Sequence, residues 1–282
     1  MKLSILTALI FVMNFAVAAD QAAMDEHIGE ATEAARKPAA RDLDDEQKKM
    51  NEAAAAKDEK GVVESATRIL GVDSKNLKAL NALAVYYYNQ GKFGLSRLIL
   101  LRAVNDNPNN PTLENNLGMI ALAEGKQKSA IASFRHAKEL KPNYAPAAVN
   151  LGAIYLEYRD YKKAADVLGV GYEAYKSDLK RPGALDVANN YAVALSGAGD
   201  FDGAQTVFKK IMRVNDSNPQ TLYNYAVLLA GRMKNKRDGE KLIAKLKLMA
   251  DSSMDKKISD LEKYMDGSAG AKPEVKDSNG DE

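Results

Sequence analysis

Asparagines recur along the middle of the chain at an interval that indicates a binding surface. Asn116 and Asn150 stand 34 residues apart, and Asn190 and Asn224 are separated by the same 34 residues. The full series is Asn81, Asn115, Asn116, Asn150, Asn189, Asn190 and Asn224. An amide side chain offers both hydrogen-bond donors and an acceptor. Such a column can grip the backbone of an extended peptide, or it can tie neighbouring helices together, and the sequence leaves both alternatives open.

Catalytic chemistry finds little support. The two histidines, His27 and His136, stand apart from any metal-ligand spacing, and the chain has no cysteine. No serine or aspartate accompanies a histidine in a recognisable nucleophilic array, and no glycine-rich phosphate loop is present. We therefore expect a protein that is not an enzyme and that has no metal and no cofactor.

The elements that carry the asparagines repeat. Small residues recur at 34-residue steps in two runs, Ala84, Gly118, Gly152 and then Ala192, Ala226. Twelve residues after each of them come Ser96, Ala130, Ala164, Ala204 and Asp238. Four residues further on, larger apolar residues follow at Leu100, Phe134, Leu168, Phe208 and Leu242. Asp238, and Lys245 three residues after Leu242, make the last copy irregular.

This pattern resembles the tetratricopeptide (TPR) family, whose repeat is a pair of antiparallel helices. The resemblance implies an all-α, right-handed solenoid of five to six TPR hairpins with a C-terminal capping helix at 253–265. Five units are expected at 77–110, 111–144, 145–178, 185–218 and 219–252, and a degenerate hairpin at 43–76. Residues 179–184 interrupt the period, either as a tolerated loop or as a contact that alters curvature. Residues 20–42 are a polar linker or a loose helix, and 266–282 a disordered tail.

Glycine has two uses in this pattern. Gly118 is expected where the two helices of a hairpin cross opposite Ala130, because a larger side chain would hold the backbones apart. Gly91, Gly125 and Gly199 fall where a left-handed residue closes each first helix. Pro108 and Pro142 follow second helices and end them.

In TPR arrays the first helices line a concave groove, so the resemblance implies a partner-binding groove. Its expected residues are Asn81, Val85, Tyr88, Asn115, Asn116, Met119, Asn150, Ala153, Asn189, Asn190, Val193 and Asn224. The apolar members suit an amphipathic helix or an apolar peptide. The chaperone-binding subfamily clamps a C-terminal carboxylate with basic residues, and the corresponding positions here keep only Asn116, so that clamp is not expected.

Charge is distributed unevenly although the net charge is only +2. Residues 61–265 carry 30 bases against 21 acids, while 20–60 and 266–282 are acidic. The most basic stretch, 232–247, is either a solvated helix face or a docking surface for an acidic protein or anionic lipid. It lacks interleaved aromatic residues, so nucleic acid is not an expected partner.

The N-terminus has the organisation of a secretory signal peptide. Lys2 precedes a mostly apolar run from Leu3 to Phe15, and small residues at 16–19 supply a cleavage site. The apolar run is short for a membrane span of about 30 Å, although a retained anchor or a buried helix is the alternative. The segment 1–19 therefore predicts an exported protein, periplasmic or secreted, with no integral membrane segment after cleavage.

Together these features predict a non-enzymatic scaffold for an envelope complex of pilus, gliding-motility, outer-membrane-assembly or Tol–Pal type. The alternative is a chaperone-like adaptor that binds extended or amphipathic segments of exported clients. The expected partners are envelope proteins or peptides, and the sequence does not determine homo-oligomerisation.

Signal cleavage has a direct test. The intact mass of the exported protein should correspond to a chain that begins at Ala19 or Asp20, with the formal charge lowered by the loss of Lys2. Recovery of the full-length chain in the membrane fraction would contradict the prediction.

Overall fold

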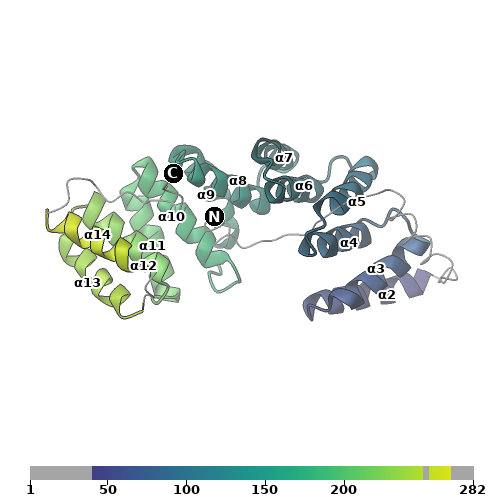
Figure 1. Ribbon diagram of the computed structural model, residues 1–282, viewed down its shortest axis with the longest axis horizontal. Helices are drawn as coiled ribbons and strands as arrows, with labels where there is room; N and C mark the ends of the chain where they lie inside the picture. The colour runs from purple at the N-terminus through teal and green to yellow at the C-terminus, as the bar shows by residue number, and fades with distance from the viewer. Residues whose placement is uncertain (1–39, 250–253, 268–282) are drawn as a thin grey trace. The chain divides into compact units, whose positions relative to one another are not determined.

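The computed structural model describes residues 40–249 and 254–267, and this part of the chain is helical without any strand (Figure 1). The predicted signal peptide at 1–19, residues 20–39 of the predicted linker and residues 268–282 of the predicted tail lie outside the described residues. Of the described residues, 40–147 belong to one compact unit and those from 148 onward to a second. Each unit is built from consecutive helices that pack as pairs.

The N-terminal unit contains three helix pairs, and α8 begins at its end. The pairs are α2 (Ala40–Ala55) with α3 (Glu59–Val72), α4 (Leu77–Asn89) with α5 (Phe93–Asp106), and α6 (Pro111–Ala123) with α7 (Gln127–Leu140). Asparagine side chains cap the first helices, because Asn76 accepts from the backbone N–H of Ala79 and Asn110 from that of Thr112. Pro111 occupies the first turn of α6, where its missing N–H costs nothing.

The C-terminal unit repeats the arrangement. Its helices are α8 (Ala145–Glu157), α9 (Tyr161–Tyr175), α10 (Ala184–Ala198), α11 (Phe201–Val214), α12 (Pro219–Ala226) with the π-helical turn η2 (Val227–Arg232), α13 (Lys236–Lys247) and α14 (Asp255–Met265). Helix α14 buries Ile258 and Leu261 in a cluster with Ile243 and Leu246 of α13. The prediction of an all-helical stack of TPR-type hairpins that ends in a capping helix is confirmed.

One left-handed residue closes the first helix of every hairpin. The glycines predicted for this position have positive φ angles of 69° at Gly91, 73° at Gly125 and 97° at Gly199. The other three hairpins use non-glycine residues that the sequence did not reveal, with φ of 58° at Lys57, 56° at Arg159 and 56° at Lys234. The turn is kept because the next residue bonds back to the first helix, as Lys126 N–H does to the carbonyl of Ala121 at 2.7 Å.

Close contact between paired helices explains the glycines inside α6 and α8. A Cβ atom on Gly118 would lie 2.6 Å from Cε1 of Phe134, and one on Gly152 would lie 2.4 Å from Cγ of Leu168. The residue opposite Gly118 is therefore Phe134, whereas the prediction placed Ala130 there. Ala130 is fully buried one turn earlier on α7. The large ring of Phe134 fills the space that the missing side chain leaves.

The first hairpin reverses these sizes. At the positions of Gly118 and Phe134, α2 carries Met50 and α3 carries Ala66, and both are buried. A large residue on the first helix thus accompanies a small residue on the second. This exchange keeps the combined volume of the pair, which is what a close-packed interior requires. The copy at 43–76 is accordingly a packed hairpin whose residue sizes are exchanged.

The last hairpin is displaced by one residue. Its left-handed residue, Lys234, comes 35 positions after Gly199, and the π-helical turn η2 absorbs the extra residue. The buried positions of α13 are Gly239, Ile243 and Leu246, whereas the 34-residue period predicted Asp238, Leu242 and Lys245. The mismatch in the last repeat therefore comes from an insertion in its first helix.

The longer insertion between α9 and α10 contributes to the core. Leu179 is buried in a cluster with Tyr172 and Ala188. Gly183 then begins α10 with a φ of 86°. The segment at 179–184 is therefore anchored by an apolar side chain.

The helix crossing predicts the effect of a substitution. Gly118→Leu should lower the free energy of unfolding by about 1–3 kcal/mol, because the new side chain overlaps the ring of Phe134. Urea unfolding followed by circular dichroism measures the change. Lys128→Leu, at an exposed position of α7, is the control and should change stability by less than about 0.5 kcal/mol. Equal losses in the two variants would show that the crossing does not depend on glycine.

Candidate functional site

The predicted groove residues all lie on first helices of the hairpins. In the N-terminal unit these are Asn81, Val85 and Tyr88 of α4 and Asn115, Asn116 and Met119 of α6. In the C-terminal unit they are Asn150 and Ala153 of α8, Asn189, Asn190 and Val193 of α10, and Asn224 of α12. Their accessibility and bonding differ widely.

Asparagines of the N-terminal unit connect one hairpin to the next. Asn116 is only 1% exposed, and its Nδ2 donates to Oδ1 of Asn81 at 2.8 Å. Nδ2 of Asn115 donates in turn to Oδ1 of Asn116 at 3.2 Å. The bond between Asn116 and Asn81 joins α6 to α4, and it corresponds to the alternative in which amides tie neighbouring helices.

The same tie recurs in the C-terminal unit. Nδ2 of Asn224 donates to Oδ1 of Asn189 at 3.2 Å, which joins α12 to α10. The side-chain oxygen of Asn224 is also bonded, because Nε2 of Gln220 donates to Oδ1 of Asn224 at 3.0 Å. Asn190, one residue after Asn189, is partly exposed. Contact between any of these amides and a partner protein stays a prediction.

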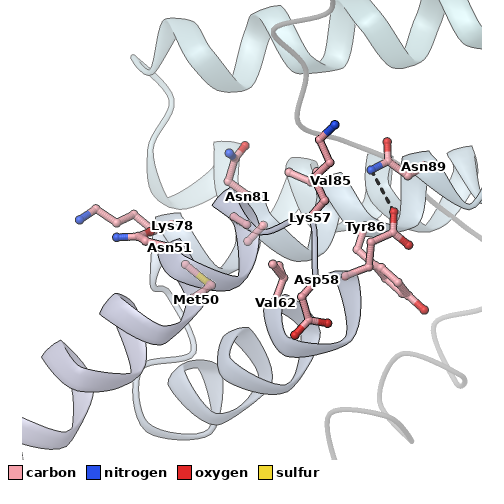
Figure 2. A pocket seen from close by; sticks show the side chains of 13 residues that line it. Met50, Asn51, Lys57, Asp58, Val62, Lys78, Asn81, Val85, Tyr86 and Asn89 are labelled. Carbon is pink, nitrogen blue, oxygen red and sulfur yellow. Dashed lines mark hydrogen bonds between the residues drawn. The ribbon is translucent and has the colours of Figure 1, made fainter.

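An open hollow of about 610 Å³ lies in the N-terminal unit between α2, the start of α3, and α4 (Figure 2). Two predicted groove residues, Asn81 and Val85, line it. The complete lining is Met50, Asn51, Ala54, Lys57, Asp58, Glu59, Val62, Lys78, Asn81, Ala82, Val85, Tyr86 and Asn89. Its volume falls within the range of about 300–1,000 Å³ that is usual for ligand sites.

Helix α2 supplies a wall of the hollow that the groove prediction missed. Met50, Asn51 and Ala54 come from it. The prediction began the groove at Asn81, because the repeat at 43–76 matches the period weakly. Met50 was the available signal, since it stands in the column of Gly118.

The consecutive tyrosines of α4 point in different directions. Tyr86 lines the hollow. The ring of Tyr88, which was expected in the groove, meets the ring of Phe93 edge-on, with 5.2 Å between centroids. Burial raises the pKa of Tyr88 to about 12. Successive residues of a helix differ by about 100° in direction, so these neighbours face different surroundings.

Titratable side chains of the described residues do not gather into a metal site. Within 40–249 and 254–267, no group of three histidine, aspartate or glutamate side chains is placed to hold a metal ion. His136 lies beside Glu114, with 3.4 Å between Nδ1 and Oε1, and the contact joins α7 to α6. His27 lies outside the described residues.

Much of the basic stretch at 232–247 is engaged in ion pairs. Lys236 pairs with Asp266 at 3.0 Å, Lys241 with Asp238 at 2.6 Å, and Lys247 with Glu262 at 2.6 Å. Lys245 contacts Asp216. This pairing favours the alternative of a solvated helix face that also links α13 to α14. None of the helices in the described chain is long and apolar enough to cross a bilayer.

Comparison with known proteins agrees with this architecture. Residues 81–145 match the family model of the tetratricopeptide repeat. The chain is 29% identical over 129 residues to BBSome complex member BBS4 of Mus musculus, covering 46% of this chain and 24% of that protein. It is 28% identical over 157 residues to a TPR repeat-containing protein of Dictyostelium discoideum, covering 54% and 57% of the two chains. The chain thus spans well under two thirds of these relatives.

Two solved structures share the fold. PilF of Pseudomonas aeruginosa superimposes with a TM-score of 0.62 at 15% identity, covering 85% of this chain and 99% of that one. A tetratricopeptide repeat protein of Parabacteroides merdae gives a TM-score of 0.51 at 15% identity, covering 80% and 86%. The matches support the TPR family, whose repeats generally form non-enzymatic surfaces that bind proteins or peptides.

The asparagine tie predicts a loss of stability. Asn116→Ala should lower the free energy of unfolding by about 1–3 kcal/mol, because it leaves Oδ1 of Asn81 without its buried donor. Asn190→Ala is the matched control, since Asn190 occupies the same repeat position and is partly exposed. Chemical unfolding of both variants should show the larger loss for Asn116→Ala, and the reverse order would contradict the role of the tie.

Proposed function

We propose that this protein is a non-enzymatic scaffold that binds a segment of a partner protein in the hollow between α2, α3 and α4. The observation that carries the proposal is the hollow itself. It combines a partly apolar surface with exposed polar groups on the first-helix face that TPR-type arrays use for binding. The similarity to BBS4, a member of the BBSome complex, is in keeping with a role inside an assembly.

The cell envelope is the proposed place of action. Support comes from the signal-peptide pattern of residues 1–19, with Lys2, the apolar run and the small residues before Asp20. The partner would then be a component of an envelope assembly of pilus, gliding-motility, outer-membrane-assembly or Tol–Pal type. Gene neighbourhood and affinity purification from envelope extract are the means of choosing among them.

A chaperone-like adaptor is the second candidate, and one feature of the hollow favours it. Ala82 and Val85 give the hollow a partly exposed apolar surface, which can accommodate side chains of different shape. An adaptor would retain many clients weakly, whereas a scaffold would retain one or two partners through a high-salt wash. The number of proteins retained therefore separates the two candidates.

Filling the hollow tests the proposal. Ala54→Arg places a long charged side chain at an exposed lining position, and it should reduce retention of partners from envelope extract at least tenfold. Ala132→Arg makes the same change at an exposed alanine in the middle of α7, outside the hollow, and should leave retention unchanged. Both alanines are exposed and helical, so thermal unfolding should be nearly unaffected in both variants. Equal retention by the two variants would exclude the hollow as the binding site.

A further inference from the structure

One end of the hollow presents hydrogen-bond donors without matching acceptors. Oδ1 of Asn81 already accepts from Asn116 at 2.8 Å, and Oδ1 of Asn51 accepts from Nε2 of Gln47 at 3.3 Å. The Nδ2 groups of Asn51 and Asn81 have no acceptor among residues 40–249 and 254–267. Each amide oxygen therefore already has one donor, and each amide nitrogen is available.

Lys78 adds a positive charge at the same end. Figure 2 shows the Lys78 side chain on the same side of the hollow as Asn51, and Asn81 lies about one turn further along α4. No carboxylate of the described chain pairs with Lys78, and the residue lies in the first turn of α4. This turn carries backbone N–H groups and the positive end of the helix dipole. It therefore does not stabilise the ammonium of Lys78, but it would stabilise an anion bound beside it.

The carboxylates of the hollow already have partners. Asp58 accepts from the backbone N–H of Gly61 at 3.1 Å and thereby caps α3. Glu59 accepts from Nε2 of Gln90 at 2.9 Å. Both acids also lie at the N-terminus of α3, where the dipole favours negative charge. The unmatched groups are therefore the donors around Lys78.

We propose that this donor end binds the carboxylate of an aspartate or glutamate side chain in a partner segment. An apolar residue of the same segment then lies against Ala82 and Val85, two partly exposed apolar residues of the lining. The inference rests on the proposed function, because it names the chemistry that the hollow selects. The donors are Asn51, Lys78 and Asn81, and only Asn81 is among the positions compared with the C-terminal carboxylate clamp.

The assignment to a side chain follows from the shape of the site. The lining continues from the donor end across the apolar residues to Lys57 and Asn89 on the other side (Figure 2). A segment that runs on in this direction presents a carboxylate within its length. The donor end has a single lysine, which matches the charge of one carboxylate. A C-terminal acidic residue would bring two carboxylates, its side chain and the chain terminus.

Selection from a random dodecapeptide library tests the proposal. The peptides are displayed without a free C-terminus, and the bait is the full-length mature protein. Selected peptides should be enriched in aspartate or glutamate next to leucine, isoleucine, valine, phenylalanine or methionine. A selected peptide should bind Lys78→Glu at least tenfold more weakly than wild type, and selection on Lys78→Glu should enrich lysine or arginine instead.

The other outcomes overturn the proposal in distinguishable ways. If the selected peptides bind Ala54→Arg as well as wild type, the hollow is not the site, and the proposed function fails with the inference. If Ala54→Arg abolishes binding but Lys78→Glu does not alter the preferred charge, only the inference fails. If enrichment appears only when the same library is displayed with a free C-terminus, the donors bind a chain terminus, and the inference fails. A dimer in sedimentation that Ala54→Arg dissociates would make a second copy the occupant.

Discussion

Volume matching where two helices cross is the constraint on which the rest of the molecule depends. Each hairpin has room for one large and one small side chain at the crossing, and the chain meets this requirement in more than one way. Gly118 lies against Phe134, while Met50 and Ala66 hold the reversed sizes. This contact sets how closely the two helices of a hairpin pair, and since a single hairpin cannot bury its apolar face alone, the paired helices still need the next hairpin to pack against them.

The sequence revealed the architecture because each crossing needs a small and a large residue at a fixed spacing, whichever small or large residue is used. A small residue followed at a fixed distance by a large one is visible in a printed sequence, as are glycines at left-handed turns. Because Met50 and Ala66 exchange the usual sizes, the sequence did not show that the first hairpin is as closely packed as the others. The π-helical turn at 227–232 hid the register of the last, since a period counted along the chain does not reveal an extra residue inside a helix.

The candidate site was harder to predict for a different reason. The sequence shows which face of a helix carries Asn116, but it does not show whether the next helix already uses that amide. Asn116 bonds to Asn81, which lies 35 positions away in the chain. The orientation of the two amides decides which atom of Asn81 is left for a ligand. Tyr86 and Tyr88 pose the same difficulty. The sequence places both on α4, but it does not show that the ring of Phe93 packs against Tyr88.

The left-handed residue of the first hairpin has a consequence for how the chain opens. Lys57 holds a φ of 58°, a conformation that costs a residue with a side chain roughly 1–2 kcal/mol relative to glycine. Its hairpin, α2 with α3, also packs against another hairpin on one side only within the described residues. In a nearly one-dimensional stack, such an end unit exchanges its amide hydrogens through local opening before the interior does. Since α2 forms a wall of the hollow, occupancy of the hollow and protection of this hairpin from hydrogen exchange must rise together.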